Sequence, residues 1–489
     1  MKTLRDIIKS ILQDVEILEM HGNLDIPVGG IHFDSRKIEK NFAFVAIEGG
    51  NSDGHQFIQN AIDNGANVVI CSIFPDEKTN NVTYIRVANT SYSLGWFISS
   101  FYGNPSSKLK LLGVTGTNGK TTVATLLYDL FRQMGYKAGL ISTVVYKIND
   151  KEIDSTHTTP DALMLNQLLQ QMVIEDCSFC FMEVSSHAVV QNRIAGLHFA
   201  GGVFTNITHD HLDYHKTFDQ YLKAKKTFFD KLPRSSFALV NNDDKNGKVM
   251  LQNTKANKYS FGIHSLANFK CRIIESHLTG MLLELENEEV WVKLIGNFNA
   301  NNALAIYSAA TLAGEKKQNI LAGLSRLKPV CGRFETMYSD KGVIVIIDYA
   351  HTPDALDNVL STINEIKPEK SSIITIVGAG GDRDKAKRPI MARIAVELSD
   401  KVIITSDNPR SENPEDIIAE MLAGVDEILV KKVLCITDRR IAIQKGCMLA
   451  GKDDIVLIAG KGHENYQEIK GIKHHFDDHE VVKENLNIV

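Results

Sequence analysis

The chain lacks any long apolar run. No stretch of its 489 residues approaches about 18 consecutive apolar residues, the shortest length that reads as a membrane span. Its first residues, Met1–Ile8, are charged and contain no apolar core of the kind found in secretion signals. We therefore expect a protein of the reducing cytoplasm rather than a membrane or secreted protein.

An excess of positive charge is also missing. The chain has 54 lysine and arginine residues against 59 aspartate and glutamate residues, which gives a net charge of −5. Nucleic-acid-binding proteins usually concentrate basic residues on one face, and this composition gives no support for that class. No internal repeat or low-complexity tract is present. The composition is that of a globular protein, and the length predicts about two to four domains.

Cysteine is scarce, with seven residues thinly spread along the chain. One pair, Cys177 and Cys180, has the spacing of a redox or zinc motif. Phe179 and Phe181 flank the second cysteine within an apolar, strand-like segment, so buried thiols are the favoured interpretation.

A glycine-rich segment, Gly113–Thr122 (GVTGTNGKTT), lies between an apolar strand-like run and a segment with apolar residues at helical spacing, Thr121–Gly135. Such a turn points backbone N–H groups and the positive end of a helix at one spot, which suits a polyphosphate. Five residues separate Gly113 from Gly119, one more than in the common P-loop. A tight turn without a ligand is disfavoured by the Lys-Thr-Thr that follows. The segment predicts a nucleoside triphosphate site.

The first 107 residues predict a small α/β domain without a catalytic signature of its own. An amphipathic helix from Leu4 precedes short strands at 31–36, 42–47, 68–71 and 84–87. Asp34-Ser35-Arg36, beside the polar turn at 49–54, could hold a polar ligand, although a surface turn is the simpler interpretation. Residues 104–107 (Asn-Pro-Ser-Ser) are the expected linker.

Residues 108–330 predict a parallel sheet wrapped by helices. Polar clusters follow the strands at 179–184 and 202–207, where ligands of open α/β sheets gather. Glu183 and the His209, His211 and His215 cluster favour Mg²⁺ beside the P-loop. A zinc site or a solvated loop is the alternative for the histidines, and zinc is the weaker choice because no cysteine lies with them.

Residues 331–489 predict a second, Rossmann-like α/β unit with strands at 343–348, 372–377, 401–405 and 454–459. Asn413 before Pro414 marks the start of one helix. Each strand is followed by a polar segment, at 349–351, 378–383, 406–410 and 460–464. Four such segments at strand ends favour one shared cleft over four separate surface loops.

Together these motifs resemble the Mur ligases of cell-wall precursor synthesis, and among them the MurE type. The resemblance extends over nearly the whole chain, from Asp34 to about Glu464, and its motifs occur in the family's order. They are GVTGTNGKTT (113–122), MEVSSHA (182–188), TNITHDHLDYH (205–215), the segment 296–305, GRFE (332–335), DYAHTPDAL (348–356), GAGGDRDKAKRP (378–389), DNPR (407–410) and GKGHE (460–464).

The resemblance implies a three-domain ATP-dependent amide ligase. Its domains would bind UDP (1–107), ATP (108–330) and the incoming amino acid (331–489). ATP would convert a D-Glu carboxylate of UDP-MurNAc-L-Ala-D-Glu into an acyl phosphate, which an amine then attacks; both steps concentrate negative charge. The residues implied for ATP are Gly116, Thr117, Asn118, Gly119, Lys120, Thr121, Thr122, Asn299, Arg333, Asp348 and His351.

The resemblance also assigns a magnesium site and a modified lysine. Thr121, Glu183 and His211 match the family's magnesium positions, and Lys225 matches a lysine that CO₂ carboxylates into a carbamate, a ligand for a second Mg²⁺. Without the family pattern, Lys225 would be interpreted as part of a solvated helix face. Catalytic roles are implied for Lys120, Glu183, His211 and Lys225.

For the sugar-nucleotide substrate, the resemblance implies contacts at both ends. The UDP end would meet residues of the first domain, and the dipeptide end would meet residues of the second. Pro160 stands where the family commonly has glycine after Thr158-Thr159. The implied residues are Phe33, Ser35, Gly50, Asn51 and Ser52 for UDP, and Thr158, Thr159, Ser185, Gln191 and Arg193 for the muramoyl dipeptide.

The choice of amino acid depends on the DNPR segment. The Arg410 guanidinium can grip the distal carboxylate of meso-diaminopimelate in a bidentate pair, and L-lysine lacks that carboxylate. Lysine-adding relatives carry a different residue at this position. We therefore expect diaminopimelate as the substrate. Separately, we expect the enzyme to be a monomer. The implied residues are Arg383, Asp407, Asn408, Pro409, Arg410, Gly460 and Glu464.

Two other functions share some of these features. A folylpolyglutamate synthetase has the same P-loop and carbamate but another acceptor, and the uridine-type first domain and the DNPR segment oppose it. A P-loop switch or transport ATPase would hydrolyse ATP without a sugar nucleotide. That function leaves the strand-end motifs of the third domain without a role.

Overall fold

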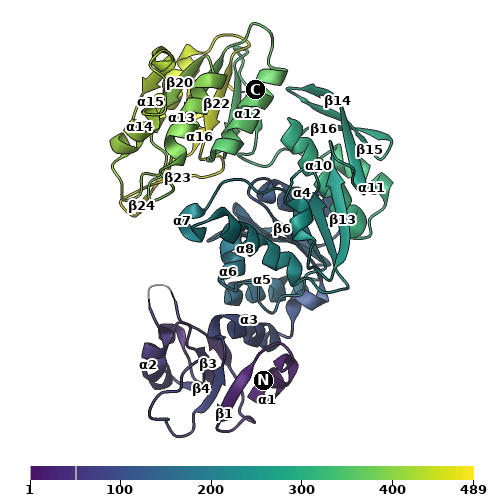
Figure 1. Ribbon diagram of the computed structural model, residues 1–489, viewed down its shortest axis with the longest axis vertical. Helices are drawn as coiled ribbons and strands as arrows, with labels where there is room; N and C mark the ends of the chain where they lie inside the picture. Colours follow the sequence, from purple (N-terminus) through teal and green to yellow (C-terminus); the bar gives the residue numbers. More distant parts are fainter. Residues whose placement is uncertain (1, 50–51, 489) are drawn as a thin grey trace.

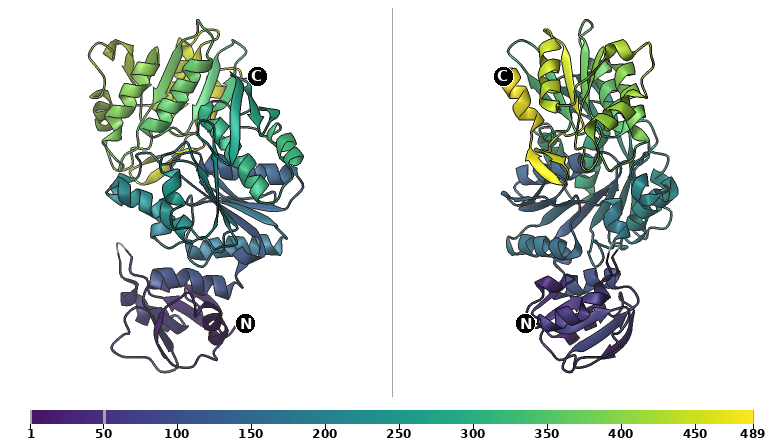
Figure 2. Two further views of the ribbon diagram at one scale, coloured as in Figure 1. Left: turned by 45° about the vertical axis from the view of Figure 1, so that its right-hand side comes forward. Right: turned by 90° about the vertical axis from the view of Figure 1, so that its left-hand side faces the viewer.

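The structure is a computed structural model that describes residues 2–49 and 52–488. Three large sheets lie in succession along the long axis of an elongated molecule, with the N-terminal domain at one end and the C-terminal domain at the other (Figures 1 and 2). A fourth sheet, the two-stranded β23–β24 hairpin, belongs to the C-terminal domain. This arrangement confirms the expected three-part α/β architecture. Within the described ranges, no helix combines the length and the hydropathy of a membrane span.

The N-terminal domain is a five-stranded sheet in the order β1-β5-β4-β3-β2, parallel except for the β1–β5 pair. Helices α1 and α3 cover one face and α2 packs on the other. The elements are α1 (Leu4–Ile11), β1 (Ile17–His21), β2 (Gly30–His32), the 3₁₀ helices Ser35–Lys37 and Gly54–Phe57, β3 (Phe42–Val45), α2 (Ile58–Asp63), β4 (Ala66–Cys71), β5 (Thr83–Val87) and α3 (Thr90–Phe101).

The central domain has eleven strands in the order β16-β15-β14-β13-β12-β11-β6-β10-β7-β8-β9. Helices α4, α10 and α11 pack on one face, and α5 and α8 pack on the other. The strands are β6 (Lys110–Thr115), β7 (Ala138–Ile141), β8 (Val145–Ile148), β9 (Lys151–Asp154), β10 (Phe179–Glu183), β11 (Gly201–Phe204), β12 (Phe237–Asn241), β13 (Asn257–Gly262), β14 (Phe269–His277), β15 (Gly280–Leu285) and β16 (Glu288–Val292). The helices are α4 (Lys120–Gln133), α5 (Ala162–Ile174), α6 (Ser186–Val190), α7 (Leu212–His215), α8 (Phe218–Asp230), α9 (Gly247–Met250), α10 (Asn297–Leu312) and α11 (Lys317–Leu324).

The middle of the central sheet is parallel as expected, but both of its edges are antiparallel, which the sequence did not predict. Strands β7, β8 and β9 pair antiparallel, as do β14, β15 and β16. Glu286 and Asn287 form a two-residue turn with φ of 50° and 66°, the backbone that matches the twist of a hairpin. A connection this short cannot carry the crossover that a parallel pair needs.

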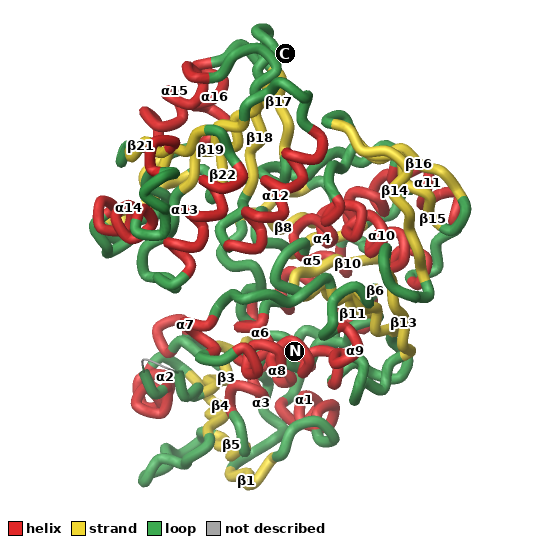
Figure 3. The backbone as a smooth tube through the Cα atoms, turned by 45° about the horizontal axis from the view of Figure 1, so that its top comes forward, coloured by secondary structure: helices red, strands yellow, loops and turns green. Residues whose placement is uncertain are grey.

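The C-terminal domain is a six-stranded sheet in the order β17-β18-β22-β19-β20-β21, parallel except for the edge strand β17. Helices α12, α13 and α14 pack on one face and α15 and α16 on the other, as Figure 3 shows. The elements are β17 (Glu335–Tyr338), β18 (Ile344–Asp348), α12 (Pro353–Ile366), β19 (Ile373–Val377), α13 (Lys387–Leu398), β20 (Lys401–Ile404), α14 (Pro414–Leu422), the 3₁₀ helix Val430–Lys432, β21 (Val433–Cys435), α15 (Arg439–Leu449), β22 (Ile455–Ala459), β23 (Tyr466–Ile469), β24 (Ile472–His475) and α16 (Asp478–Asn485).

Several local expectations are confirmed. The helix expected from Thr121 is α4, and its apolar face is buried. Helix α14 starts at Pro414, and the Asn413 side chain accepts a hydrogen bond from the Glu415 N–H at 3.3 Å. Cys177 and Cys180 are free, buried thiols. The division at 107 and 330 stays a prediction, supported by the fact that the described strands of each sheet fall within one of the three ranges.

The N-terminal domain is packed tightly onto the central domain. A Cβ at Gly95, in α3, would lie 2.3 Å from the carbonyl oxygen of Ala195, so only glycine fits. The expected linker after Asn104 is a 3₁₀ helix (Pro105–Lys108), and the buried Ser106 hydroxyl accepts a hydrogen bond from the His198 N–H at 2.9 Å. Residues 104–108 are therefore a docked connection rather than a loose one.

Candidate active site

A cavity of about 700 Å³ lies between the central and C-terminal domains. It is lined by the segments that follow β6, β10 and β11 on one side and β18, β19, β20 and β22 on the other. The strand-end segments of two domains thus face each other, as expected for ligand sites in α/β sheets. Of the eleven residues expected to bind ATP, all except Gly116 line this cavity.

The P-loop is held in shape by close backbone approaches. Gly119 has a φ of 83°, and a Cβ there would lie 2.6 Å from the Asn302 side-chain oxygen. Asn302 in turn donates to Asn299 at 2.9 Å, so helix α10 supports the loop. The Lys120 Nζ donates to the carbonyl oxygens of Gly116 at 3.0 Å and Thr117 at 2.8 Å. This lysine lies at the loop where a terminal phosphate would sit.

Glu183 at the end of β10 meets the start of α4. Its carboxylate accepts from the Thr121 hydroxyl at 3.0 Å and from the Thr143 N–H at 2.7 Å. The Arg333 guanidinium, which comes from the C-terminal side, donates to the same Thr121 hydroxyl at 3.2 Å. A buried carboxylate, a hydroxyl and a cation from three segments therefore converge at one point.

Lys225 and Lys226 differ sharply in their surroundings. Lys225 is buried, and its Nζ donates to the Gly116 carbonyl oxygen at 2.7 Å. Burial, together with the charge of Lys120, lowers the pKa of Lys225 well below its usual value. Lys226 forms an ion pair with Asp230, one turn further along α8, at 2.6 Å. The structure therefore places Lys225, and not Lys226, in the cavity wall.

The three histidines after β11 take different positions. Only His211 lines the cavity, and it stands 5.0 Å from the ring of His187, which also lines it. Desolvation lowers the pKa of His211, so its neutral ring can act as a ligand. His215 is buried against the Ser186 hydroxyl at 2.8 Å, and His209 faces Asp384 at 3.3 Å. These three rings do not form a zinc site.

The residues expected to bind the dipeptide form a connected group. Thr159 donates to the Glu183 carbonyl oxygen at 2.8 Å and accepts from the Ser185 N–H at 3.1 Å. Arg193 donates to the Thr159 carbonyl oxygen at 2.6 Å and to the Gln191 side chain at 2.9 Å. Thr158, Thr159, Ser185 and Arg193 line the cavity, and Gln191 does not.

The residues expected to bind UDP lie outside this cavity, in the N-terminal domain. Phe33 is half-buried beside His32, Ser35 is buried and Ser52 is exposed. Gly50 and Asn51 lie outside the described residues. Ala162 is buried in the same apolar cluster as Ile31, and Phe33 packs against that cluster, so this region adjoins the segment that follows Thr159.

On the C-terminal side, the DNPR turn is bound to the segment after β22. The Asn408 amide donates to Glu464 at 2.8 Å, and Lys461 donates to Asn408 at 3.2 Å. Gly460 has a φ of 116°, and a Cβ there would lie 2.6 Å from an Asp407 carboxylate oxygen. Six of the seven residues expected to bind diaminopimelate line the cavity, and Pro409 does not. The six are Arg383, Asp407, Asn408, Arg410, Gly460 and Glu464.

Arg410 is held in an unusual conformation. Its φ is 51°, a left-handed value that costs free energy for a residue with a side chain. Its Nη1 donates to the Gly381 carbonyl oxygen at 2.7 Å, and its N–H donates to the Glu468 carbonyl oxygen at 3.0 Å. The strained backbone and these bonds aim the guanidinium at the cavity.

Arg333, Asp348 and His351 lie together beside the P-loop. The Arg333 guanidinium stacks on the Tyr349 ring at 4.3 Å from its centroid. Asp348 accepts from the Phe334 N–H at 2.7 Å, and burial raises the pKa of Asp348 to about 6. Burial and the charge of Lys387 lower the pKa of His351 to about 4, which favours its neutral ring.

Several residues in the cavity wall or directly beside it were not predicted from the sequence: Asp354, Lys387 and Asn302 line the cavity, and Lys461 lies behind it. Asp354, at the start of α12, accepts from Asn118 of the P-loop at 2.8 Å. Lys387 donates to the His351 carbonyl oxygen at 2.9 Å, and the buried Lys461 neutralises Asp407 and Glu464. All four residues stand inside the family-like segments, Asp354 in 348–356, Asn302 in 296–305, Lys387 in 378–389 and Lys461 in 460–464. Their contacts could not be predicted, because they join segments that are far apart in the chain.

The donor set beside Lys120 fits a hard divalent cation. Thr121 and Glu183 supply a hydroxyl and a carboxylate that already lie 3.0 Å apart, and His211 supplies a neutral imidazole from the cavity wall. Oxygen donors with an occasional imidazole suit Mg²⁺.

Three parts of the chain match known families. Residues 27–102 match "Mur ligase family, catalytic domain", residues 114–310 match "Mur ligase middle domain", and residues 332–462 match "Mur ligase, glutamate ligase domain". Together these segments include most of the cavity residues.

Individual proteins are similar over nearly their full length. The chain is 56% identical over 477 residues to a UDP-N-acetylmuramoyl-L-alanyl-D-glutamate--2,6-diaminopimelate ligase of Bacteroides fragilis, covering 98% of both chains. A solved structure with the same name is 31% identical, with a TM-score of 0.71 and 99% of both chains covered. A folylpolyglutamate synthase of Mycobacterium tuberculosis complexed with ADP has a TM-score of 0.63 at 16% identity, covering 76% of this chain and 92% of that one. This last likeness shows the fold alone.

Proposed function

The chain belongs to the Mur ligase family, and we propose that it joins meso-2,6-diaminopimelate to UDP-MurNAc-L-Ala-D-Glu at the expense of ATP. One observation carries the proposal: Arg410 and Glu464 line the same cavity as the P-loop lysine, Lys120. A phosphate site and a site for an amino acid with a charged distal end therefore face each other.

The proposed reaction has two steps. The D-Glu carboxylate attacks the γ-phosphorus of ATP, which gives an acyl phosphate and ADP. The amine of the incoming amino acid then attacks the acyl carbon, the C–O bond to phosphate breaks, and the amine loses a proton as the amide forms. Lys120, Arg333 and the N–H groups of the P-loop stabilise the negative charge that both steps concentrate.

Mg²⁺ belongs to the same proposal. Thr121, Glu183 and His211 would hold one ion, a carboxylated Lys225 would be a ligand of a second ion, and both ions would neutralise phosphate charge. The low pKa of Lys225 supports the modification, because only the neutral amine adds to CO₂. The products of that addition are a carbamate and a proton, and the buried neutral amine becomes an anionic ligand.

The other ends of the substrates complete the assignment. We place the dipeptide against Thr158, Thr159, Ser185, Gln191 and Arg193, and the UDP group in the N-terminal domain near Phe33 and Ser35. We also propose that the protein acts as a monomer. The substrates named here are those of the cytoplasm, where we expect the protein to work.

Arg410 and Glu464 provide the basis for selecting diaminopimelate. A guanidinium pairs with a distal carboxylate through two parallel hydrogen bonds, and Glu464 can accept from the distal ammonium. L-lysine would leave Arg410 without that partner. Loss of a charge-assisted pair costs about 1.5–3 kcal/mol, or roughly 10- to 150-fold in kcat/KM.

The direct test measures phosphate release from ATP and Mg²⁺ with UDP-MurNAc-L-Ala-D-Glu. Meso-diaminopimelate, L-lysine and no amino acid are compared, and the tripeptide product is identified by mass. We expect release that depends on diaminopimelate and exceeds the lysine rate by at least about 10-fold. Equal or faster reaction with lysine would overturn the role of Arg410. Release without the sugar nucleotide would overturn the ligase itself.

A further inference from the structure

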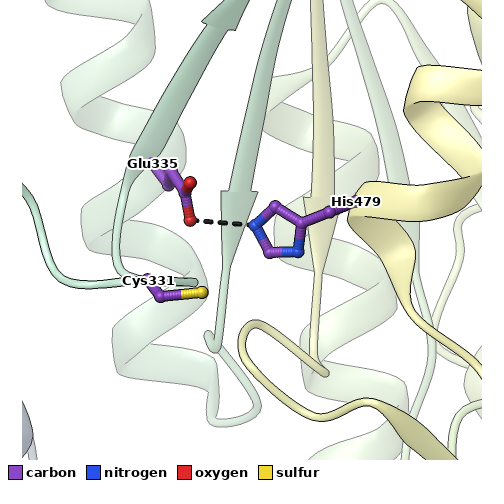
Figure 4. Close-up of side chains that lie close together, drawn as sticks. All are labelled: Cys331, Glu335 and His479. Atoms are coloured by element: carbon purple, nitrogen blue, oxygen red, sulfur yellow. Dashed lines mark hydrogen bonds and ion pairs between the residues drawn. The ribbon is translucent and has the colours of Figure 1, made fainter.

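A cluster of three metal-ligand side chains lies outside the active-site cavity. Cys331, Glu335 and His479 each offer one ligand atom, and these atoms lie within 4.8 Å of one another. Figure 4 shows the Cys331 sulfur, the Glu335 carboxylate and the His479 ring turned toward a common point. They come from the connection before β17, from the first residue of β17 and from the first turn of α16.

The histidine is oriented by a further carboxylate. His479 Nε2 faces Glu335 at 2.9 Å, whereas its Nδ1 lies 3.0 Å from an Asp477 oxygen. A carboxylate that accepts from one imidazole nitrogen fixes the ring and presents the other nitrogen to a metal. Nothing in the proposed ligase reaction uses this arrangement.

The element that carries His479 is anchored independently. Asp478, its neighbour, forms a fully buried pair with Arg439 of α15, at 2.7 and 2.8 Å. Glu335 is also fixed, because its carboxylate accepts from the Gly332 N–H at 2.8 Å. Cys331 is exposed, so the third ligand can approach the other two and a fourth position is open to water.

We propose that Cys331, Glu335 and His479 bind one zinc ion, with water as the fourth ligand, and that the ion fastens the interdomain connection to α16. Thiolate, imidazole and carboxylate are the ligands that zinc takes in proteins, at about 2.0–2.3 Å. Magnesium and calcium avoid thiolates, so the cluster selects a transition metal rather than the cation expected in the cavity.

The position of the cluster gives the site a mechanical role. Residues 325–334 connect α11 of the central domain to β17 of the C-terminal domain. Arg333, two residues after Cys331, reaches Thr121 in the cavity. A metal on Cys331 therefore ties this connection to the C-terminal domain just before the residue that contacts the P-loop.

A simple hydrogen-bonded cluster is the competing interpretation. Although burial lowers the pKa of His479, hydrogen bonds to Cys331 and Glu335 raise it to about 11. In the metal-free protein the His479 ring is therefore protonated and donates to these partners. Zinc has to displace that proton, as it does wherever it binds histidine and cysteine.

Cobalt titration of the full-length protein tests the proposal. Co²⁺ is added in the presence of excess Mg²⁺, which fills hard-oxygen sites, and thiolate-to-cobalt charge-transfer absorption is recorded. We expect one equivalent of Co²⁺ to produce the band and Zn²⁺ to remove it. Cys331→Ser should abolish the band. Cys435→Ser is the matched control, because Cys435 is the other exposed cysteine among the described residues, and this variant should retain it.

Three further variants test the histidine ligand: His479→Gln, Asp477→Asn in its carboxylate partner, and the control His475→Gln. His479→Gln should weaken Zn²⁺ binding about 100-fold in competition with a chromogenic chelator, and Asp477→Asn should weaken it about 10- to 100-fold. His475→Gln, which changes an exposed histidine paired with Glu480, should leave the affinity unchanged. No band in the parent protein, or a band that survives Cys331→Ser, overturns the proposal. The Cys331→Ser result holds even if His479→Gln fails to fold, because Cys331 is exposed.

Discussion

At the scale of single residues, Lys225 shows how burial changes the chemistry of a side chain. A lysine on a solvated helix stays protonated and cannot add to CO₂. Lys225 is enclosed by the P-loop carbonyl of Gly116, by the ring of Tyr221 at 4.6 Å and by the charge of Lys120. All three conditions come from the fold, and none can be deduced from the Lys223–Lys226 run alone.

We predict that Lys225→Ala lowers the ligase rate by about 100-fold or more, because an anionic ligand in a site of concentrated charge is lost. A short carboxylate such as acetate, added in excess, should restore part of the rate by entering the vacated space. The measurement is the phosphate-release assay, with and without acetate.

The control for this prediction is the neighbouring residue. Lys226→Ala removes only a partly buried ion pair with Asp230 on the same helix, and pairs with this spacing are worth about 0.3–0.5 kcal/mol. Its rate should stay within a few-fold of the parent rate. A Lys225→Ala enzyme that keeps most of its activity without added carboxylate would exclude the carbamate.

At the scale of structural elements, the P-loop and helix α12 meet across the two domains. The Asp354 carboxylate, in the first turn of α12, accepts from Asn118 at 2.8 Å and from Thr208 at 3.4 Å. One side chain of the C-terminal domain therefore contacts two loops of the ATP-binding domain.

We predict that Asp354→Ala raises the KM for ATP by about 5- to 10-fold, because it removes hydrogen bonds worth about 1 kcal/mol each between α12 and the P-loop. Steady-state kinetics at saturating sugar nucleotide and amino acid measure the change. Asp357→Ala, an exposed acid one turn away on the same helix, is the control and should leave KM unchanged. Equal KM values for the two variants would show that the contact does not support ATP binding.

The elements themselves were predictable where a local pattern determines them. The P-loop helix, the helix that begins at Pro414 and the four C-terminal strands follow from apolar spacing and capping residues. The antiparallel edges of the central sheet were not predicted. Strands β14, β15 and β16 are joined by short turns with no helix between them, so they depart from the alternation of strands and helices that indicates a parallel sheet. Asp354 and Asn302 were missed for a different reason: their contacts join segments far apart in the chain.

At the scale of the whole molecule, two domains form the cavity and only the connection at 325–334 leads from one to the other. Few covalent restraints therefore oppose a change in their relative position. Binding charged substrates between two such domains favours an arrangement in which both walls contact them.

We predict that the radius of gyration decreases when a non-hydrolysable ATP analogue, Mg²⁺, the sugar nucleotide and diaminopimelate are all bound. Small-angle X-ray scattering of the ligand-free and fully liganded protein measures this change. Lys120→Ala, which lacks the phosphate-binding cation, should show a smaller decrease under the same conditions. An unchanged radius for the parent protein would count against domain closure.

The tight seat of the N-terminal domain has a different consequence. Because Gly95 abuts Ala195 without room for a methyl group, and Ser106 is bonded to His198, that domain has little freedom to swing. The distance between the proposed uridine site and the P-loop is then fixed. Each extra amino acid would add about 3.5 Å to an extended peptide. A sugar nucleotide one residue too short or too long would thus place its carboxylate away from the P-loop. The rigid N-terminal domain would in this way select substrates by their length.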